Sequence, residues 1–409
     1  MFKTGLLALG SLLVVSSAYA QAHRTLPKGV RMLAYRNVNT TKIDATYNQA
    51  QAVTPLSYNI NANAKTLEDA NSAAKLYFEQ LQAISPEAYD QLTFGEFNIS
   101  AVAQVQVHGF GGGYGINEKL TVFGILPYYN ARVNMKYKQL RGSNSEAVAD
   151  QVQQSGQGDI DSTIGNITGS IPSATGTVVQ SVLVNTFGYE EIGDWQGSGY
   201  GDFELGAMYR LIDRGTWGFA VSSGVVAPTG RQDDPDLLQD IAFGDGQWDV
   251  FVEGAYGFVL NDSLMFGTTL RYTYQAPAEK NLRIPESRDF MMSDRKGDFI
   301  VKYGDKVDAV LNATYTFNDW FSLTPAYEMN YQMSSQYDSV YGDANGYLEY
   351  NSDRIGHVGR LSASVSSIQP FLKKKFALPA QINFNVQQTL AGKNVPKMGR
   401  FEVELRMLF

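Results

Sequence analysis

The chain lacks cysteine altogether, has only three histidines, and has no run of about 18 consecutive apolar residues. Without cysteine there are no disulfides, no thiolate metal sites and no lipid attached at a cleavage-site cysteine. Without a long apolar run there is no transmembrane helix. The net charge of −8 makes nucleic acid a poor partner. Because the histidines are dispersed, at His23, His108 and His357, we expect no enzyme, no cofactor and no metal.

The first twenty residues have the layout of a secretory signal peptide. Lys3 precedes an apolar run from Leu6 to Val15, and the segment ends in Ala18-Tyr19-Ala20, a small-x-small cleavage site. We therefore exclude residues 1–20 from fold reasoning. The mature chain is expected to enter an oxidising compartment without using disulfides there.

Apolar and polar residues alternate along most of the remaining chain, as they do in strands that have one apolar face. A closed barrel whose apolar face meets lipid explains such a length better than one soluble core does. We predict an all-β, transmembrane antiparallel barrel of about twelve strands, with a helical insert near the N-terminus. The strands are expected at 30–38, 98–109, 120–137, 202–211, 217–227, 248–260, 264–274, 307–317, 321–331, 361–365, 382–386 and 401–409. Including 30–38 gives the even number that bacterial barrels carry.

The last strand resembles the C-terminal signal strand that the outer-membrane assembly machinery of Gram-negative bacteria reads. Its apolar positions alternate with Glu402, Glu404 and Arg406 and end on an aromatic residue: Phe401, Val403, Leu405, Met407 and Phe409. Short joins such as 261–263 alternate with long ones such as 228–246, which is the pattern of periplasmic turns and external loops. These features predict the outer membrane of a Gram-negative bacterium, with its lipids and lipopolysaccharide as partners.

The polar face of each strand is expected to line the barrel interior. Our candidates for the lumen or the transport path are Gln106, His108, Glu253, Arg271, Glu328 and Arg360. Pro325 interrupts a strand and cannot donate a ladder hydrogen bond, so it is expected at a bulge or kink. A kink can open a gap in the wall, or it can simply be tolerated near a rim.

Several segments have less definite patterns. Residues 21–97 hold the first strand and, at 39–97, either an external cap or an inward plug with a helix over 67–84. Residues 98–409 form the barrel, with a large extracellular loop at 139–198. The glycine-rich run 109–115 is expected at a periplasmic turn, since it fits neither nucleotide-binding motif. Aspartates at 233–245 indicate a solvated loop, with a Ca²⁺ site as the alternative.

One stretch resembles a known family. Gly199-Tyr-Gly-Asp202-Phe-Glu-Leu-Gly206 and the later Pro228-Thr229-Gly230 are similar to the hairpin and loop start of the outer-membrane barrels associated with meta-cleavage phenol degradation. Those barrels are related to FadL-type channels for fatty acids and aromatic hydrocarbons. The resemblance implies a channel with lateral release of its solute. It departs from the FadL type in having twelve strands rather than fourteen, and in a segment 21–29 that we expect to be too short to form a plug.

The sequence therefore favours passive uptake of small hydrophobic or aromatic compounds. A general polar porin and a barrel-anchored surface interaction protein stay open as alternatives. The composition carries no information on the solute's identity or on the oligomeric state.

Overall fold

The computed structural model describes residues 23–70, 72–154, 164, 168, 176–288 and 291–409. The expected signal peptide at 1–20 lies outside the described residues. In the described part, no helix is both long and apolar enough to cross a membrane.

Twelve antiparallel strands close into a barrel, as the alternation predicts. The first barrel strand pairs with the last and closes the barrel at this seam. The barrel strands are β1 (Arg31–Thr40), β5 (Thr93–Asn117), β6 (Leu120–Arg141), β8 (Phe203–Asp213), β9 (Trp217–Ala227), β10 (Asp249–Val259), β11 (Leu264–Gln275), β14 (Lys306–Thr316), β15 (Phe321–Gln332), β17 (Arg354–Ser366), β18 (Ala380–Lys393) and β20 (Gly399–Leu408). The expected strand at 30–38 is thus confirmed as β1.

The two faces of the wall differ as lipid and lumen require. Leu205, Val252 and Leu311 are about half exposed on the outer face. Their strand neighbours Glu204 and Asn312 are buried on the inner face. A closed sheet satisfies its backbone hydrogen bonds internally, so only its side chains need to suit the surrounding lipid.

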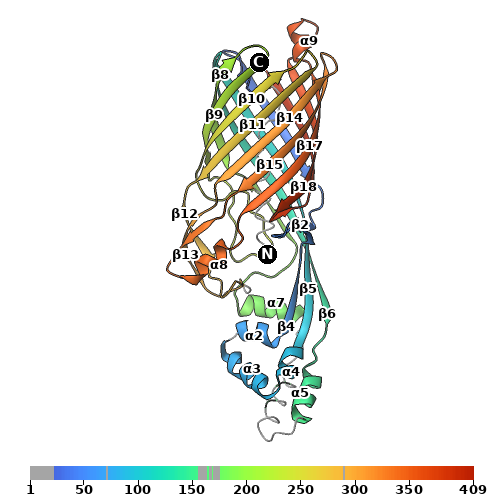
Figure 1. The fold of residues 1–409 in the computed structure, drawn as a ribbon, viewed down its shortest axis with the longest axis vertical. Helices are drawn as coiled ribbons and strands as arrows, with labels where there is room; N and C mark the ends of the chain where they lie inside the picture. The colour runs from blue at the N-terminus through green and yellow to red at the C-terminus, as the bar shows by residue number, and fades with distance from the viewer. Residues whose placement is uncertain (1–22, 71, 155–163, 165–167, 169–175, 289–290) are drawn as a thin grey trace.

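Short turns join the strands at one end of the barrel, and long segments join them at the other (Figure 1). We call these the short-turn end and the long-loop end. The short-turn end also carries α9 (Ile368–Leu372). Two small sheets lie at the long-loop end. One contains β2 (Ala45–Tyr47), β3 (Val53–Pro55) and β19 (Val395–Pro396). The other contains β12 (Ala278–Arg283), β13 (Lys296–Lys302) and β16 (Gln336–Asp338), and α8 (Asp343–Glu349) lies beside it.

Strands β5 and β6 run far past the rim and form an arm beyond the barrel (Figure 1). The arm is widened by β4 (Ser57–Asn63) and β7 (Trp195–Tyr200), which pair with β5 and β6. Helices pack on it from both insertions: α2 (Ala64–Ala70), α3 (Ser72–Ile84), α4 (Pro86–Gln91), α5 (Ser145–Gln154) and α7 (Gly176–Asn185). The helical part of 39–97 therefore stands outside the barrel together with the helices of 139–198.

The orientation expected for β5 is wrong. Gln106 and His108 lie on the outer face, where His108 Nδ1 is 2.8 Å from the Tyr35 hydroxyl and 3.3 Å from the Asn37 amide. Val105 and Val107 point inward and are buried. The apolar face of β5 points inward because apolar residues of a loop fill this part of the lumen.

The glycine-rich run 109–115 lies within β5, so the turn expected there is wrong. The turn falls instead at Glu118 and Lys119. The absence of side chains is needed because a Cβ at Gly115 would collide with the backbone of Leu26 and Pro27.

The described part of 21–29 lies on the inner side of the wall at the short-turn end. The Leu26 amide donates to Thr121 Oγ1 (2.8 Å), and the Gly29 amide donates to the Gly115 carbonyl (2.8 Å). His23 is buried against Gly218, whose missing side chain leaves room for the ring. These contacts are with neighbouring strands of one part of the wall, so the expectation that 21–29 is too short to plug the barrel stays a prediction.

Pro325 produces neither a bulge nor a register shift. The β14–β15 ladder pairs Asn312 with Ala326 and Tyr315 with Leu323 in one register, and only the two intervening pairs are missing. The ladder on the other side, with β17, continues through Pro325. The missing N–H therefore costs a local gap in one ladder.

The lipid-facing assignment can be tested at Leu270, which is 58% exposed on β11. We expect Leu270→Arg to lower the free energy of unfolding by about 2–4 kcal/mol, since a cation would face hydrocarbon. The control Leu270→Met should cost less than about 1.5 kcal/mol. Urea unfolding in phospholipid vesicles measures both, and equal costs would contradict the assignment.

Candidate functional site

One side of the lumen is a wall of ion pairs. Arg36 of β1 contacts Glu402 (3.1 Å) and Glu404 (3.3 Å) of β20. Next to it, Arg360 of β17 pairs with Glu328 of β15 at 2.7 Å. Amides of β18 complete the wall, with Asn383 donating to Glu404 and Asn385 to Glu402. Alternation places all these side chains inside, where they tie neighbouring strands together.

A second charged group spans part of the lumen. Arg271 of β11 makes a two-pronged contact with Glu204 of β8, at 3.1 and 2.8 Å, although two strands, β9 and β10, separate them in the wall. Its guanidinium also lies 3.7 Å from the centre of the Phe251 ring. Glu253 is the direct ladder partner of Arg271. The Arg271–Glu204 pair therefore ties β11 to β8 on the inner side of the wall.

The long-loop mouth is filled by an apolar cluster. The 228–246 loop folds inward and buries Ile241 and Phe243 against the inner faces of β1, β5 and β6. The Phe243 ring stacks on Tyr129 at 5.2 Å between centroids and an angle of 5°. The cluster comprises Val38, Ile43, Leu56, Ala101, Ala103, Val105, Val107, Tyr129, Ala131, Val133, Ile241, Phe243 and Met398, with Met135 and Trp195 against it. We call it the mouth cluster.

Asp202, at the start of β8, holds the base of this loop. Its carboxylate accepts from the amides of Gly230 (2.8 Å) and Asp245 (3.2 Å), one at each end of the loop. Gly230 and Gly244 lie so close that a Cβ on either would clash. The Thr229 hydroxyl adds a bond to the Gly201 carbonyl. The Gly-Asp and Pro-Thr-Gly motifs of the sequence are thus the two halves of one clamp.

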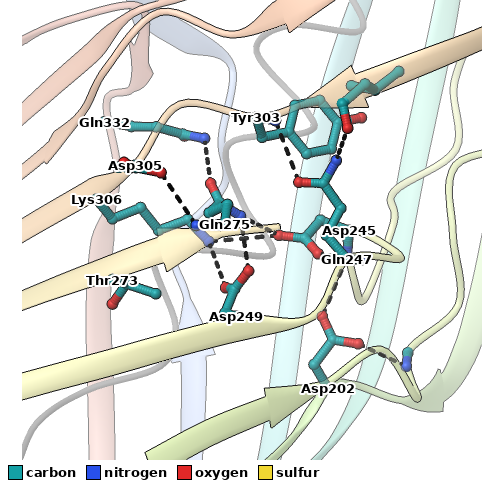
Figure 2. Close-up of polar contacts among 12 residues, drawn as sticks. Asp202, Asp245, Gln247, Asp249, Thr273, Gln275, Tyr303, Asp305, Lys306 and Gln332 are labelled. Atoms are coloured by element: carbon teal, nitrogen blue, oxygen red, sulfur yellow. Dashed lines mark hydrogen bonds and ion pairs between the residues drawn. The ribbon is translucent and has the colours of Figure 1, made fainter. Parts of the chain in front are cut away.

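A polar network continues from the clamp around the rim (Figure 2). Lys306 lies 3.6 Å from both Asp245 and Asp249, and Gln275 donates to Asp245 at 2.7 Å. Gln247 joins the loop to the outer sheet by donating to the Val301 carbonyl. The network therefore ties the inward loop to β10, β11, β14 and the external β12–β13 hairpin.

The acidic loop is not the solvated segment that we expected. Asp240 is buried and pairs with Arg231 at 2.9 Å, and Asp236 pairs with Arg283 and Lys296. Within the described residues, no three acidic, histidine or cysteine side chains are grouped so as to hold a metal ion. The aspartates shape the loop because each has a cationic or backbone partner in the protein.

A shallow apolar groove of about 390 Å³ lies in the wall near the short-turn end. Its floor is bare backbone, because Gly112 of β5 and Gly124 of β6 are ladder partners. Residues of both faces line it, Phe123 and Gly113 from inside and Leu33 and Leu205 from outside. The wall therefore lacks side chains on its outer face at this point.

The structure separates the predicted site residues into two sets. Glu253, Arg271, Glu328 and Arg360 face the lumen and take part in its charged groups, while Gln106, His108 and Pro325 lie on the outer face. Their role in transport stays a prediction. Sequence reasoning missed the inward loop, although the paired Gly-Asp and Pro-Thr-Gly motifs were its signal.

No family model matches the chain, and no curated protein matches it. Among solved structures, an outer membrane channel from Pseudomonas putida F1 is similar at 13% identity and a TM-score of 0.53, over 97% of this chain and 100% of that one. A Pseudomonas aeruginosa FadL homologue matches at 8% identity and 0.35, over 95% and 91%. The "CymD monoaromatic hydrocarbon channel" matches at 11% and 0.33, over 99% and 96%. The first likeness shows that this chain shares the barrel fold of that protein.

The clamp at Asp202 predicts a pH dependence of the inward loop. Burial, and then the neighbouring Asp245, raise the pKa of Asp202 to about 6 in the closed state. A raised pKa means that protonation stabilises closure, fully below the ordinary pKa near 4 and less as the pH rises through 6. We expect amides of 228–246 to exchange less readily at pH 5 than at pH 7.5, after correction for intrinsic rates.

Asp202→Asn is the control, since its side chain does not titrate. Its one amide oxygen can accept only one of the two hydrogen bonds, which in the wild type go to different carboxylate oxygens, so the loop should exchange more readily at both pH values. Its exchange should not depend on pH over this range. An unchanged pH dependence in Asp202→Asn would assign the effect to another group.

Proposed function

We propose that the protein is an outer-membrane channel through which small hydrophobic or aromatic molecules enter passively. The observation that carries this proposal is the mouth cluster, which closes the long-loop mouth with apolar side chains, Tyr129 and Phe243 buried within it and Trp195 packed against it. A hydrophobic solute can exchange for such side chains at little cost, whereas a sugar or an ion would lose its hydration there. The likeness to an outer membrane channel supports this function at the level of the fold.

The long-loop end faces the outside in this proposal, and the short turns face the periplasm. The solute leaves sideways in this proposal, and residues 23–29 narrow one side of the short-turn end. The groove at Gly112 and Gly124 is the exit that fits best, since its lining is apolar and comes from both faces of the wall. The Pro325 gap is the weaker candidate, because the register is unbroken there.

The charged lumen residues then have a supporting role. Arg271, Glu328 and Arg360 each have a charged partner within 3 Å, so they hold the wall and leave the apolar path along β5 and β6. A general polar porin would need charged side chains that face an open aqueous passage. Here Arg271, Glu328 and Arg360 are instead paired with charged side chains of other strands.

Uptake of a radiolabelled monoaromatic compound in a deletion strain tests the proposal. The wild-type protein should speed entry over an empty control. Gly112→Leu should slow entry several-fold, because the side chain fills the groove without a clash. Gly254→Leu is the matched control, a glycine on the outer face of β10 remote from the groove.

Barrel yield is checked in each strain by heat-dependent gel mobility. If the aromatic compound enters equally well without the protein while an inert sugar requires it, the polar porin replaces this proposal. If Gly112→Leu and Gly254→Leu behave alike, the exit lies elsewhere.

A further inference from the structure

The arm formed by β5 and β6 has two different faces. Its inner face carries odd-numbered residues such as Phe97 and Tyr137, whose rings stack 5.3 Å apart. The helices of both insertions cover this side, burying Phe78, Leu81 and Val152 against it. The outer face carries the even-numbered residues, and among the described residues the buried helix side chains pack on the inner face.

Three cations stand in a row on the outer face. Arg132, Lys136 and Lys138 of β6 are all exposed, with Asn134 between them. Their ladder partners on β5 are uncharged: Gln104, Ser100 and Asn98. Within the described residues none of the three forms an ion pair. Of the acidic residues near β6, Asp194 accepts a hydrogen bond from the Met135 amide, and Glu96 lies opposite Arg141 at the tip.

This face continues the lipid-facing face of the same strand. Below Arg132, the outward residues of β6 are Asn130, Tyr128, Leu126 and Val122. Tyr128 and Tyr200 pack edge to face at 5.2 Å, in the manner of an interfacial aromatic girdle. The three cations therefore face the layer that surrounds the protein above the hydrocarbon.

We propose that this face binds the phosphorylated oligosaccharide of the surrounding lipopolysaccharide. The assignment rests on the outer-membrane placement proposed above, and it does not depend on which solute is transported. Phosphates would pair with Arg132, Lys136 and Lys138. Two residues of an extended strand span about 7 Å, so Lys136 and Lys138 are about 7 Å apart, and Arg132 is about twice as far from Lys136. The side-chain amides of Asn134, Gln104 and Asn98 supply donors and acceptors for sugar hydroxyls.

Height along the strand distinguishes sugar phosphates from phospholipid headgroups. Lys136 lies eight residues beyond Tyr128, which is about 27 Å along an extended strand and about 20 Å above the girdle after tilt. Phospholipid headgroups end within a few ångströms of the girdle. Only the phosphorylated sugars of the outer leaflet reach that far.

Binding of purified lipopolysaccharide to the full-length protein in nanodiscs tests the proposal. We expect Arg132→Gln/Lys136→Gln/Lys138→Gln to bind about tenfold more weakly than the wild type, as loss of three exposed ion pairs implies. The matched control is Lys373→Gln/Lys374→Gln/Lys375→Gln, which removes the same charge at the exposed short-turn end. The control should bind like the wild type, and wild-type binding should weaken as salt rises.

Two probes distinguish the source of the phosphate. Lipopolysaccharide stripped of phosphate should bind the wild-type protein no more tightly than intact lipopolysaccharide binds the triple variant. Added phosphatidylglycerol should not compete. Equal binding by the triple variant and the wild type, equal binding of the stripped probe, or competition by phosphatidylglycerol would each overturn the proposal. Lys136→Glu serves as a milder second variant if the triple variant gives a low barrel yield, and uptake measured in parallel keeps this outcome separate from the channel proposal.

Discussion

The ladder between β1 and β20 is the interaction on which the rest of the structure depends. It joins the two ends of the chain: the Phe409 amide donates to the Arg31 carbonyl, and the Arg31 amide donates back to Phe409. An open edge in hydrocarbon would leave a row of unpaired backbone groups, each costing several kcal/mol. Once this seam closes, every strand has an inside and an outside. Residues 23–29, which precede Arg31, lie against the inner side of the wall at the end where this seam begins.

Closure also explains how the mouth is built. Asp202 and Thr229 stand at the same end of the β8–β9 hairpin, so the pairing of those strands brings the Gly-Asp and Pro-Thr-Gly motifs together. The carboxylate of Asp202 then binds an amide at each end of the 228–246 loop and directs the loop inward. Ile241 and Phe243 become buried because the loop has nowhere else to place them. A polar clamp at the rim thus creates an apolar constriction inside it.

The sequence alone predicted what depends on local pattern. The order of the strands and the lipid-facing side of β8, β10 and β14 follow from alternation and were correct. The even strand number came from the rule that bacterial barrels carry even numbers. Strands β5, β17 and β18 are much longer than expected. Errors arose where a third segment decides the outcome. Val105 and Val107 face inward because a distant loop packs on them, and Gly115 is a strand residue because Leu26 and Pro27 lie against it. Neither partner can be read from the strand itself, since both contacts join residues far apart in the sequence.

Strands β5 and β6 show why an apolar face does not always mean a lipid face. Along their length they meet three surroundings: lipid at Gly112 and Gly124, the mouth cluster at Val107 and Tyr129, and open space beside the helices at Lys136. Alternation is continuous through all three, because a pleated strand cannot change its period without a bulge. What changes is which face is apolar. The apolar face of β5 changes from the outside to the inside of the barrel near His108. Beyond this point the outward side chains are polar and the inward ones are valines, so it corresponds to the edge of the hydrocarbon layer.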